Sequence, residues 1–400
     1  MKSCHGVTRL RVNLYRAKFV QPIASTPIED GVVAVKRGRI AAVGPRSDFA
    51  GPFTDFGECA LLPGFINAHC HLDYTDMAGE VPLRGGFTAW LGDITARKRT
   101  WTQPQFAVSA CNGLIGASRS GTTMLCDIAS SPDNLGLAAA APMRVLSCLE
   151  LIDVAGQVPD ESLWLCCAGL SPHAPFTASG ALYEKAHTFC RKRRRIFTTH
   201  LAESLDERAM FEDARGPLHE RLAALGRPMS DCGHGSSVAL LDRLGVLRGA
   251  LMVHANCLSD DDVVRLARGK AAVVHCPTSH LFFGHQAFPL ERLRAAGVPV
   301  CLGTDSAASG ATLDMRDEMR HFLSAFPASR PSDALGMATV VAAAALKRPG
   351  VTGTLVPDAK ADMIAVAVKR NPRDLAEAVI ESRGAVGLSM VNGKVVHRED

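Results

Sequence analysis

Two histidines one residue apart, His69 and His71, end an apolar stretch that runs through a Pro-Gly turn. On an extended strand, residues i and i+2 point to the same face, so both imidazoles can be directed at one point. Imidazole nitrogens are common ligands of zinc and of other divalent metals. Two of them converging at the end of one strand form half of a metal site, and the other half must come from later segments.

Later apolar stretches end in residues that can complete such a site. His200 and Asp305 each follow a segment of β-forming residues. Three imidazoles and one carboxylate suit Zn²⁺ or Fe²⁺ and leave a position for water, whose pKa the metal lowers to about 7. The sequence therefore predicts one divalent metal, Zn²⁺ before Fe²⁺, bound by His69, His71, His200 and Asp305.

Glu203 lies three residues after His200, just past the end of the predicted strand. From there its carboxyl group can reach the same water without binding the metal, which is the position of a proton carrier. Asp127 and Glu150 also end predicted strands, but such carboxylates more often bind neighbouring loops than take part in catalysis. For His275, a place in the wall of the fold and a direct role both stay open.

The middle of the chain alternates between two patterns. Eight apolar runs, of which the fourth begins at Leu163, each have a polar residue at or near their end, and most are separated by stretches with helical period. Strands that alternate with helices indicate a parallel sheet, and eight repeats favour a (β/α)8 TIM barrel over residues 61–351, whose strand ends form the active face. The alternative is an open doubly wound sheet, but no GxGxxG motif follows an early strand to support it.

The two ends of the chain have a different pattern. Residues 1–60 and 352–400 hold short β-like runs, with turns predicted at Arg37-Gly38 and Asn392-Gly393. Asn-Gly between apolar runs is a strong hairpin signal. We expect both ends to build one small β-sandwich domain beside the barrel.

Composition narrows the class of protein. A formal net charge of +4 over 400 residues argues against nucleic acid as a partner. The basic run 191–195 is either a solvated helix end or an anion patch. Thirteen cysteines without a disulfide spacing indicate a reducing compartment, and we see neither a signal segment nor an apolar run that could span a bilayer. We expect a cytoplasmic protein that acts on a small molecule and does not bind membranes.

The motifs PGFINAHCHLD, SPHAP, THLAES, VHAN, VHCPTSH and LGTDSAAS occur in this order along nearly the whole chain. Together they resemble the amidohydrolase superfamily, and within it the cytosine-, guanine- and adenosine-type deaminases. The segment AKADM before an apolar strand near the end of the chain is also familiar from this superfamily. It departs from the usual pattern only at Ala359, where relatives usually carry glycine. Binuclear members of the superfamily bridge two metals with a carbamylated lysine on a mid-barrel strand. Lys98, Lys185 and Lys192 all lie in helix-like stretches, so a single metal is expected.

The resemblance implies hydrolytic removal of ammonia from a ring amidine, such as C6 of an aminopurine or C4 of a pyrimidine. It implies that Asp305 takes a proton from the attacking water, that Glu203 protonates the ring nitrogen, and that His254 orients the water. It also implies a homodimer. An amide or imidazolone-type ring hydrolase on the same scaffold is an alternative, as is a non-catalytic member, although such chains usually lose ligands.

The resemblance also bears on the substrate. His173 in SPHAP is similar to the histidine that contacts substrate in methylthioadenosine and S-adenosylhomocysteine deaminases. The short segment between His71 and Trp90, together with His280 in place of a common asparagine, looks more like the aminodeoxyfutalosine deaminases of menaquinone biosynthesis. That substrate comes first, and adenosine-like nucleosides come second. Trp90 and Phe87 either stack on the substrate ring or pack beneath a loop.

Overall fold

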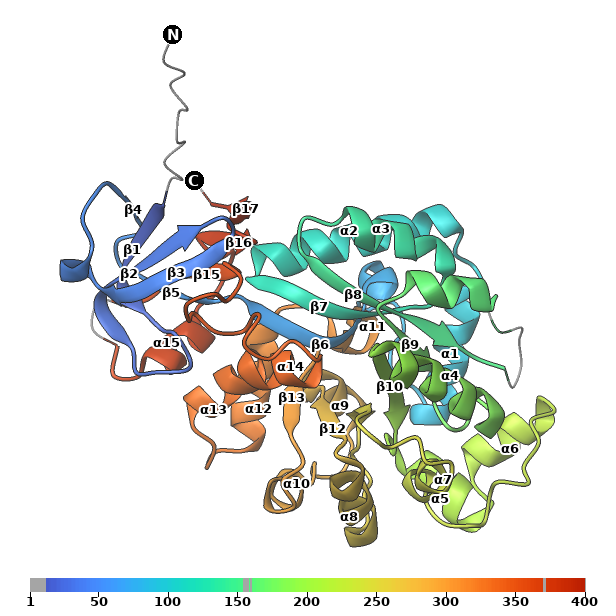
Figure 1. The fold of residues 1–400 in the computed structure, drawn as a ribbon. Coiled ribbons are helices and arrows are strands. Elements are labelled where there is room, and N and C mark those ends of the chain that lie inside the picture. Colours follow the sequence, from blue (N-terminus) through green and yellow to red (C-terminus); the bar gives the residue numbers. More distant parts are fainter. Residues whose placement is uncertain (1–11, 154–157, 159, 370–371, 400) are drawn as a thin grey trace.

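The computed structural model describes residues 12–153, 158, 160–369 and 372–399, and in them it places two sheets side by side (Figure 1). The larger sheet is parallel throughout and has the strand order β13-β12-β11-β10-β9-β8-β7-β6-β14. Its strands are β6 (Phe65–His71), β7 (Thr122–Ala129), β8 (Arg144–Leu151), β9 (Gly169–Pro172), β10 (Ile196–Leu201), β11 (Leu251–His254), β12 (Ala272–His275), β13 (Val300–Leu302) and β14 (Asp305–Ser306).

The eighth barrel strand closes the sheet in two pieces. β13 pairs with β12, and after Gly303 and Thr304 the chain resumes as β14, which pairs with the first barrel strand, β6. A Cβ atom on Gly303 would lie 2.8 Å from the carbonyl oxygen of His69, so this crossing needs a glycine. Closure confirms the predicted (β/α)8 barrel and brings Asp305 next to the end of β6.

Helices cover the outside of the barrel, as Figure 1 shows. Ser259 begins one of them: its hydroxyl accepts a hydrogen bond from the Asp262 amide, while the Asp262 carboxylate accepts one from the Ser259 amide. The α-helices are α1 (Phe87–Lys98), α2 (Gln103–Arg119), α3 (Leu135–Ala140), α4 (Gly180–Arg193), α5 (Leu205–Asp213), α6 (Pro217–Ala224), α7 (Ser237–Arg243), α8 (Asp260–Gly269), α9 (Pro277–Phe283), α10 (Leu290–Ala295), α11 (Ala307–Gly310), α12 (Met315–Ala325), α13 (Pro331–Met337), α14 (Val340–Ala345) and α15 (Leu375–Glu381).

Short 3₁₀ turns link several elements, and one of them corrects a boundary. The apolar run from Leu163 was expected to open the fourth barrel strand, but residues Glu161–Cys166 form the 3₁₀ helix η4, and the strand begins only at Gly169. The side chain of Asp160 caps this turn by accepting from the Ser162 amide. Short apolar runs do not distinguish helix from strand by themselves. The other 3₁₀ helices are η1 (Arg46–Asp48), η2 (Leu72–Met77) and η3 (Pro132–Asn134).

Strands from both ends of the chain build the second sheet, as predicted. They are β1 (Asn13–Val20), β2 (Ile28–Lys36), β3 (Arg39–Pro45), β4 (Phe53–Asp55), β5 (Cys59–Pro63), β15 (Met363–Ala367), β16 (Leu388–Val391) and β17 (Lys394–Arg398). Asn392 and Gly393 turn between β16 and β17 with φ of 52° and 73°, as a type I′ hairpin requires. The basic run 191–195 lies at the end of α4, where its first four residues are exposed.

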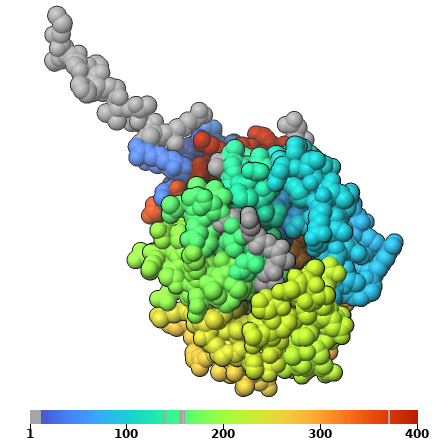
Figure 2. All heavy atoms as spheres, turned by 90° about the vertical axis from the view of Figure 1, so that its right-hand side faces the viewer, coloured from blue at the N-terminus to red at the C-terminus, as the bar shows by residue number. Residues whose placement is uncertain are grey.

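The carboxyl ends of the barrel strands face one side of the molecule. Strands β7 and β8 run toward the right-hand side of Figure 1, and Figure 2 views that side directly. A hollow opens near the middle of this face, between segments coloured cyan, green and yellow. None of the described helices is both long and apolar enough to cross a membrane.

Candidate metal centre and active site

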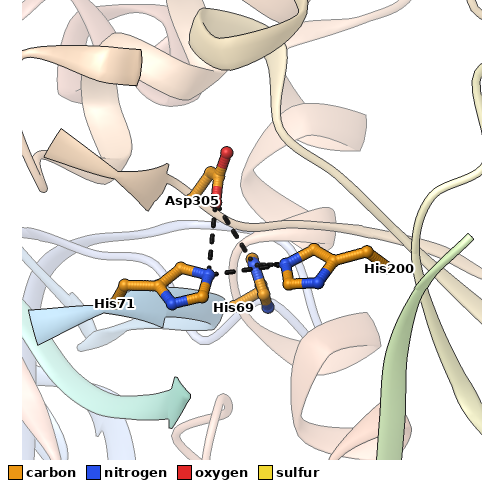
Figure 3. Close-up of side chains that lie close together, drawn as sticks. All are labelled: His69, His71, His200 and Asp305. Atoms are coloured by element: carbon orange, nitrogen blue, oxygen red, sulfur yellow. Dashed lines mark hydrogen bonds and ion pairs between the residues drawn. The ribbon is translucent and has the colours of Figure 1, made fainter. Parts of the chain in front are cut away.

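Four side chains converge where β6, β10 and β14 end, and Figure 3 shows them pointing at one another. Their nearest atoms are separated by 3.2 Å between His69 Nε2 and His200 Nε2, and by 3.4 Å between His71 Nε2 and His200 Nε2. Asp305 Oδ1 lies 3.4 Å and 3.5 Å from the Nε2 atoms of His69 and His71. Donors about 2.05 Å from a tetrahedral ion are spaced by about 3.3 Å, so these four atoms fit one divalent metal.

His200 presents a lone pair rather than a proton to this point. His200 Nδ1 lies 2.8 Å from the carbonyl oxygen of His173 and donates its proton there, which leaves Nε2 as an acceptor. Burial, followed by the neighbouring His69, lowers the pKa of His200 to about 4. The same two causes lower the pKa of His71 well below its ordinary value. Neutral imidazoles of this kind are what a metal binds.

The carboxylate of Asp305 is held from its far side. Its Oδ2 atom accepts hydrogen bonds from the hydroxyls of Ser279, at 2.8 Å, and Ser309, at 3.0 Å. Burial alone would raise the pKa of Asp305, but the hydrogen bond from His69 and the surrounding imidazoles bring it well below its usual range. Asp305 is therefore ionised, with Oδ1 turned toward the histidines.

The backbone at these strand ends is unusual. His254 and Asp305 have φ of 71° and 58°, and Ala202, just after β10, has φ of 50°. Residues with a side chain seldom adopt this left-handed conformation, which costs on the order of 1–3 kcal/mol and is concentrated at functional sites. Here it redirects the chain at the barrel mouth so that consecutive side chains reach the same centre.

Glu203 lies next to His254, whose ring stacks on that of the ligand His200 with centroids 5.4 Å apart. Its carboxyl oxygen Oε1 is 3.5 Å from His254 Nε2, and only 7% of the residue is exposed. Burial, then the charges of Asp305 and Glu207, raise the pKa of Glu203 well above its ordinary value. Glu207 accepts the backbone amides of Ala202 and Glu203 at 2.8 and 2.9 Å, which holds this loop in place. A raised pKa suits a carboxyl group that must donate a proton.

His173 and His280, both predicted to bind substrate, lie next to residues of this site. The ring of His173 is 4.8 Å from that of His200, and its Nδ1 atom lies 2.7 Å from the Thr177 hydroxyl. His280 Nδ1 lies 3.1 Å from Asn256 Oδ1, and the Asn256 amide donates to the carbonyl oxygen of Glu203 at 3.0 Å. His280 thus contacts the residue that holds the Glu203 backbone.

The other predicted residues make their printed contacts with aromatic neighbours rather than with the metal ligands. The indole of Trp90 is buried, donates to the Val81 carbonyl oxygen at 3.0 Å and meets the ring of Phe283 edge-on at 4.9 Å. Phe87 also contacts Phe283. Both aromatic residues therefore pack beneath the loop. The ring of His275 stacks on Phe288 with centroids 3.9 Å apart, which places it in the barrel wall.

Sequence reasoning did not single out Ser279, Ser309, Asn256 or Glu207. The first three lie inside the motifs HCPTSH, DSAAS and VHAN, so their positions were in view but their contacts were not. The three lysines considered as metal bridges lie in helices α1 and α4, and none belongs to the ligand cluster.

Comparison with known proteins decides the family. The amidohydrolase family matches residues 60–396, which is most of the chain. The chain belongs to the amidohydrolase family. A 5-methylthioadenosine/S-adenosylhomocysteine deaminase of Moorella thermoacetica is 29% identical, over 94% of this chain and 92% of its own. An aminodeoxyfutalosine deaminase of Deinococcus radiodurans is also 29% identical, over 75% and 78% of the two chains.

A solved structure shares the fold of this amidohydrolase. An adenosine deaminase from Xanthomonas campestris with bound zinc superposes with a TM-score of 0.83 at 24% identity, covering 96% of this chain and 92% of that one. Family, relatives and site agree that the protein is a hydrolytic deaminase. A divalent metal fits its cluster of three histidines and one aspartate.

Proposed function

We propose that this amidohydrolase deaminates a 6-aminopurine nucleoside, with 6-amino-6-deoxyfutalosine as the first candidate substrate. One observation carries the reaction type: the Glu203 carboxyl group is buried, lies 3.5 Å from His254 Nε2 and is not one of the four ligands. A carboxyl group at that place can move a proton between water, ring and leaving amine.

The proposed roles of the residues are those that the family resemblance implies, and their geometry is compatible with them. His69, His71, His200 and Asp305 would hold a divalent metal, which would lower the pKa of a water at this site. Asp305, ionised and turned inward, accepts the proton of the attacking water at a carboxylate oxygen. Glu203 donates its proton to the ring nitrogen next to the reacting carbon. That carbon then accepts the water oxygen. Glu203 takes the remaining proton from this oxygen and passes it to the amino group; the carbon–nitrogen bond breaks, ammonia leaves and the oxygen becomes a carbonyl. The proton held by Asp305 then returns to Glu203.

His254 positions the attacking water. Its Nε2 atom lies 3.5 Å from Glu203, and burial, the largest cause, lowers its pKa well below the ordinary value despite the nearby Asp305. A neutral imidazole can accept or donate one hydrogen bond without competing for the substrate's charge. We propose zinc as the metal because three imidazoles and a carboxylate suit it, and we keep Fe²⁺ as the alternative.

Two features support this ranking of the candidate substrates. The segment between His71 and Trp90 is short, and His280 stands in the HCPTSH motif, which resembles aminodeoxyfutalosine deaminases. The relative from Deinococcus radiodurans is named for that activity. The relative from Moorella thermoacetica, which matches more of the chain, favours 5′-methylthioadenosine or S-adenosylhomocysteine as the second candidate. Adenosine belongs to the same second group. A cytoplasmic homodimer stays a prediction.

Ammonia release from purified protein of known metal content tests the proposal. The panel contains aminodeoxyfutalosine, adenosine, 5′-methylthioadenosine, S-adenosylhomocysteine, guanine and cytosine. We expect ammonia from a 6-aminopurine nucleoside with about one metal per chain. Ring opening or amide cleavage without ammonia would instead assign an amide or imidazolone-type hydrolase, and silence across the panel with metal bound would overturn the nucleoside assignment.

A further inference from the structure

Glu318 is a buried acid that the proposed chemistry does not use. It lies in α12 with 1% of its surface exposed, and the arginines of the same helix, Arg316 and Arg320, pair with Asp314 and Asp317 instead. Burial raises the pKa of Glu318 to about 8. An acid buried without a cation beside it costs free energy, so stability alone does not explain its place here.

The Glu318 carboxyl group caps a helix other than its own. Its Oε2 atom accepts the Thr278 backbone amide at 3.0 Å. That amide belongs to the first turn of α9, where the residue before the helix, Cys276, supplies no side-chain acceptor. Amides of a first helical turn have no partner within the helix and need one from outside. The Thr278 hydroxyl also lies 2.8 Å from Nδ1 of His321 in α12, so α12 fixes where α9 begins.

The next residue of α9 contacts the metal centre. The hydroxyl of Ser279 donates to Asp305 Oδ2 at 2.8 Å, and Ser279 is buried. The other oxygen of this carboxylate, Oδ1, lies 3.4 Å and 3.5 Å from the Nε2 atoms of His69 and His71 (Figure 3). Because Thr278 and Ser279 are consecutive in one helical turn, the bond at Thr278 also sets the position of the Ser279 hydroxyl.

A second hydroxyl on Asp305 offers a comparison. Ser309 of α11 donates to the same Oδ2 atom at 3.0 Å. Within the part of the chain that the structure describes, no hydrogen bond joins Ser309 to Glu318. The two hydroxyls therefore act on one oxygen, but only that of Ser279 is connected to Glu318 through its helix.

We propose that Glu318 is a positioning residue for the metal ligand Asp305. It acts by accepting the Thr278 amide, which holds the first turn of α9 where the Ser279 hydroxyl meets Oδ2. Oδ1 is thereby kept turned toward the histidines. Residues that orient metal ligands change metal affinity about 10–100-fold when they are removed. The inference rests on the metal centre of the proposed function and concerns binding of the ion, whichever nucleoside is the substrate.

Zinc affinity of the full chain, measured by competition with a colorimetric chelator, tests this role. E318A removes the acceptor for the Thr278 amide, and we expect it to bind Zn²⁺ about 10-fold more weakly than the wild type. E318Q keeps a carbonyl oxygen that can accept the same amide. It is the conservative control, and its affinity should stay within about twofold of the wild type, the usual spread of such comparisons.

Double-mutant cycles show whether Glu318 acts through Ser279. S279A alone should weaken zinc binding about 10-fold. If loss of Glu318 has already displaced the Ser279 hydroxyl, E318A/S279A should be about 10-fold weaker than the wild type rather than about 100-fold. The matched control is E318A/S309A. Its two losses concern independent contacts, so they should multiply to about 100-fold. A helix cap that only stabilised the fold would not make one serine differ from the other.

Each outcome decides the question. Zinc affinity of E318A equal to that of the wild type, or losses that multiply with S279A, would overturn the inference. Losses that fail to multiply with S309A as well would also overturn it, because the substitution would then disturb all the surroundings of Asp305. E318Q as weak as E318A would assign the effect to charge instead of position.

The test also separates this role from the function on which it rests. A wild-type chain that binds neither Zn²⁺ nor Fe²⁺ overturns the metal centre and this role together, whereas a failed substrate panel leaves the zinc measurements valid. If E318A does not fold, E318D takes its place in both cycles, because aspartate keeps the charge but is one methylene too short to reach the Thr278 amide.

Discussion

Replacing Glu203 by glutamine should remove proton transfer while leaving folding and metal binding unchanged. Burial and two neighbouring carboxylates raise the pKa of Glu203, so its protonated form is favoured in the folded protein. Glutamine has nearly the shape of that neutral acid. We therefore expect E203Q to fold normally, to bind as much metal as the wild type and to unfold at a temperature no lower than the wild type.

The size of the kinetic effect follows from the role. A positioned acid–base group contributes about 10²–10⁴ in rate, and the Glu203 carboxyl has the burial and the raised pKa of an effective acid. We expect kcat/KM to fall about 10³-fold, which is about 4 kcal/mol of transition-state stabilisation. The loss should appear in kcat, because the amide can still hydrogen-bond to the substrate but cannot transfer a proton.

Initial rates of ammonia release, measured on protein whose metal content has been determined, provide the assay. D127N is the control, because Asp127 is a buried carboxylate whose pKa burial raises to about 8 but which lies outside the ligand cluster. E203Q with more than a tenth of the wild-type activity would refute the proton-carrier role. E203Q that loses its metal would show instead that Glu203 supports binding of the ion.

The remaining predictions concern the ligand carboxylate and the pH profile. D305N should lose both metal and activity, measured by metal analysis and ammonia release, because an amide puts a donor or a weaker acceptor where Oδ1 now faces two imidazoles. S309A removes one of the two hydroxyls on Oδ2 and should weaken metal binding about 10-fold in a chelator competition. The wild-type rate should fall as pH rises through the raised pKa of Glu203, since the acid must be protonated to donate, and this alkaline limb should be absent in E203Q. A limb that persists in E203Q would belong to another group.

The sequence predicts most of the metal centre because its ligands obey local rules. His69 and His71 share a face of one strand, and barrel strands must bring their carboxyl ends together, so His200 and Asp305 follow once eight repeats are recognised. The hydroxyls that orient Asp305 follow no such rule. Ser279 comes from a helix 26 residues earlier in the chain, and only packing of α9 and α11 around β14 reveals the contact.

The role of Trp90 could not be predicted for a related reason. An aromatic residue in the helix after the first barrel strand can face the substrate or the core with the same sequence pattern. The choice depends on Phe283 at the end of α9, nearly two hundred residues later, which packs against the indole edge. For Glu150, a bond to a loop and a catalytic role both stay open, because no described residue donates a hydrogen bond to its carboxyl group.

The environments of two carboxyl groups carry the acid–base argument. Asp305 and Glu203 are both buried, and burial raises the pKa of each. Around Asp305, three imidazoles reverse that effect, so the group stays ionised where it must accept a proton. Around Glu203, the nearby charges are those of Asp305 and Glu207, and they raise its pKa further. Glu203 therefore holds a proton where it must donate one. Pairs of titratable groups pushed in opposite directions mark acid and base in an active site. The charge of Asp305 helps to raise the pKa of Glu203. Removing that charge in D305N should lower the pKa of Glu203, so less of Glu203 is protonated at a given pH. The alkaline limb of any residual activity should therefore shift to lower pH.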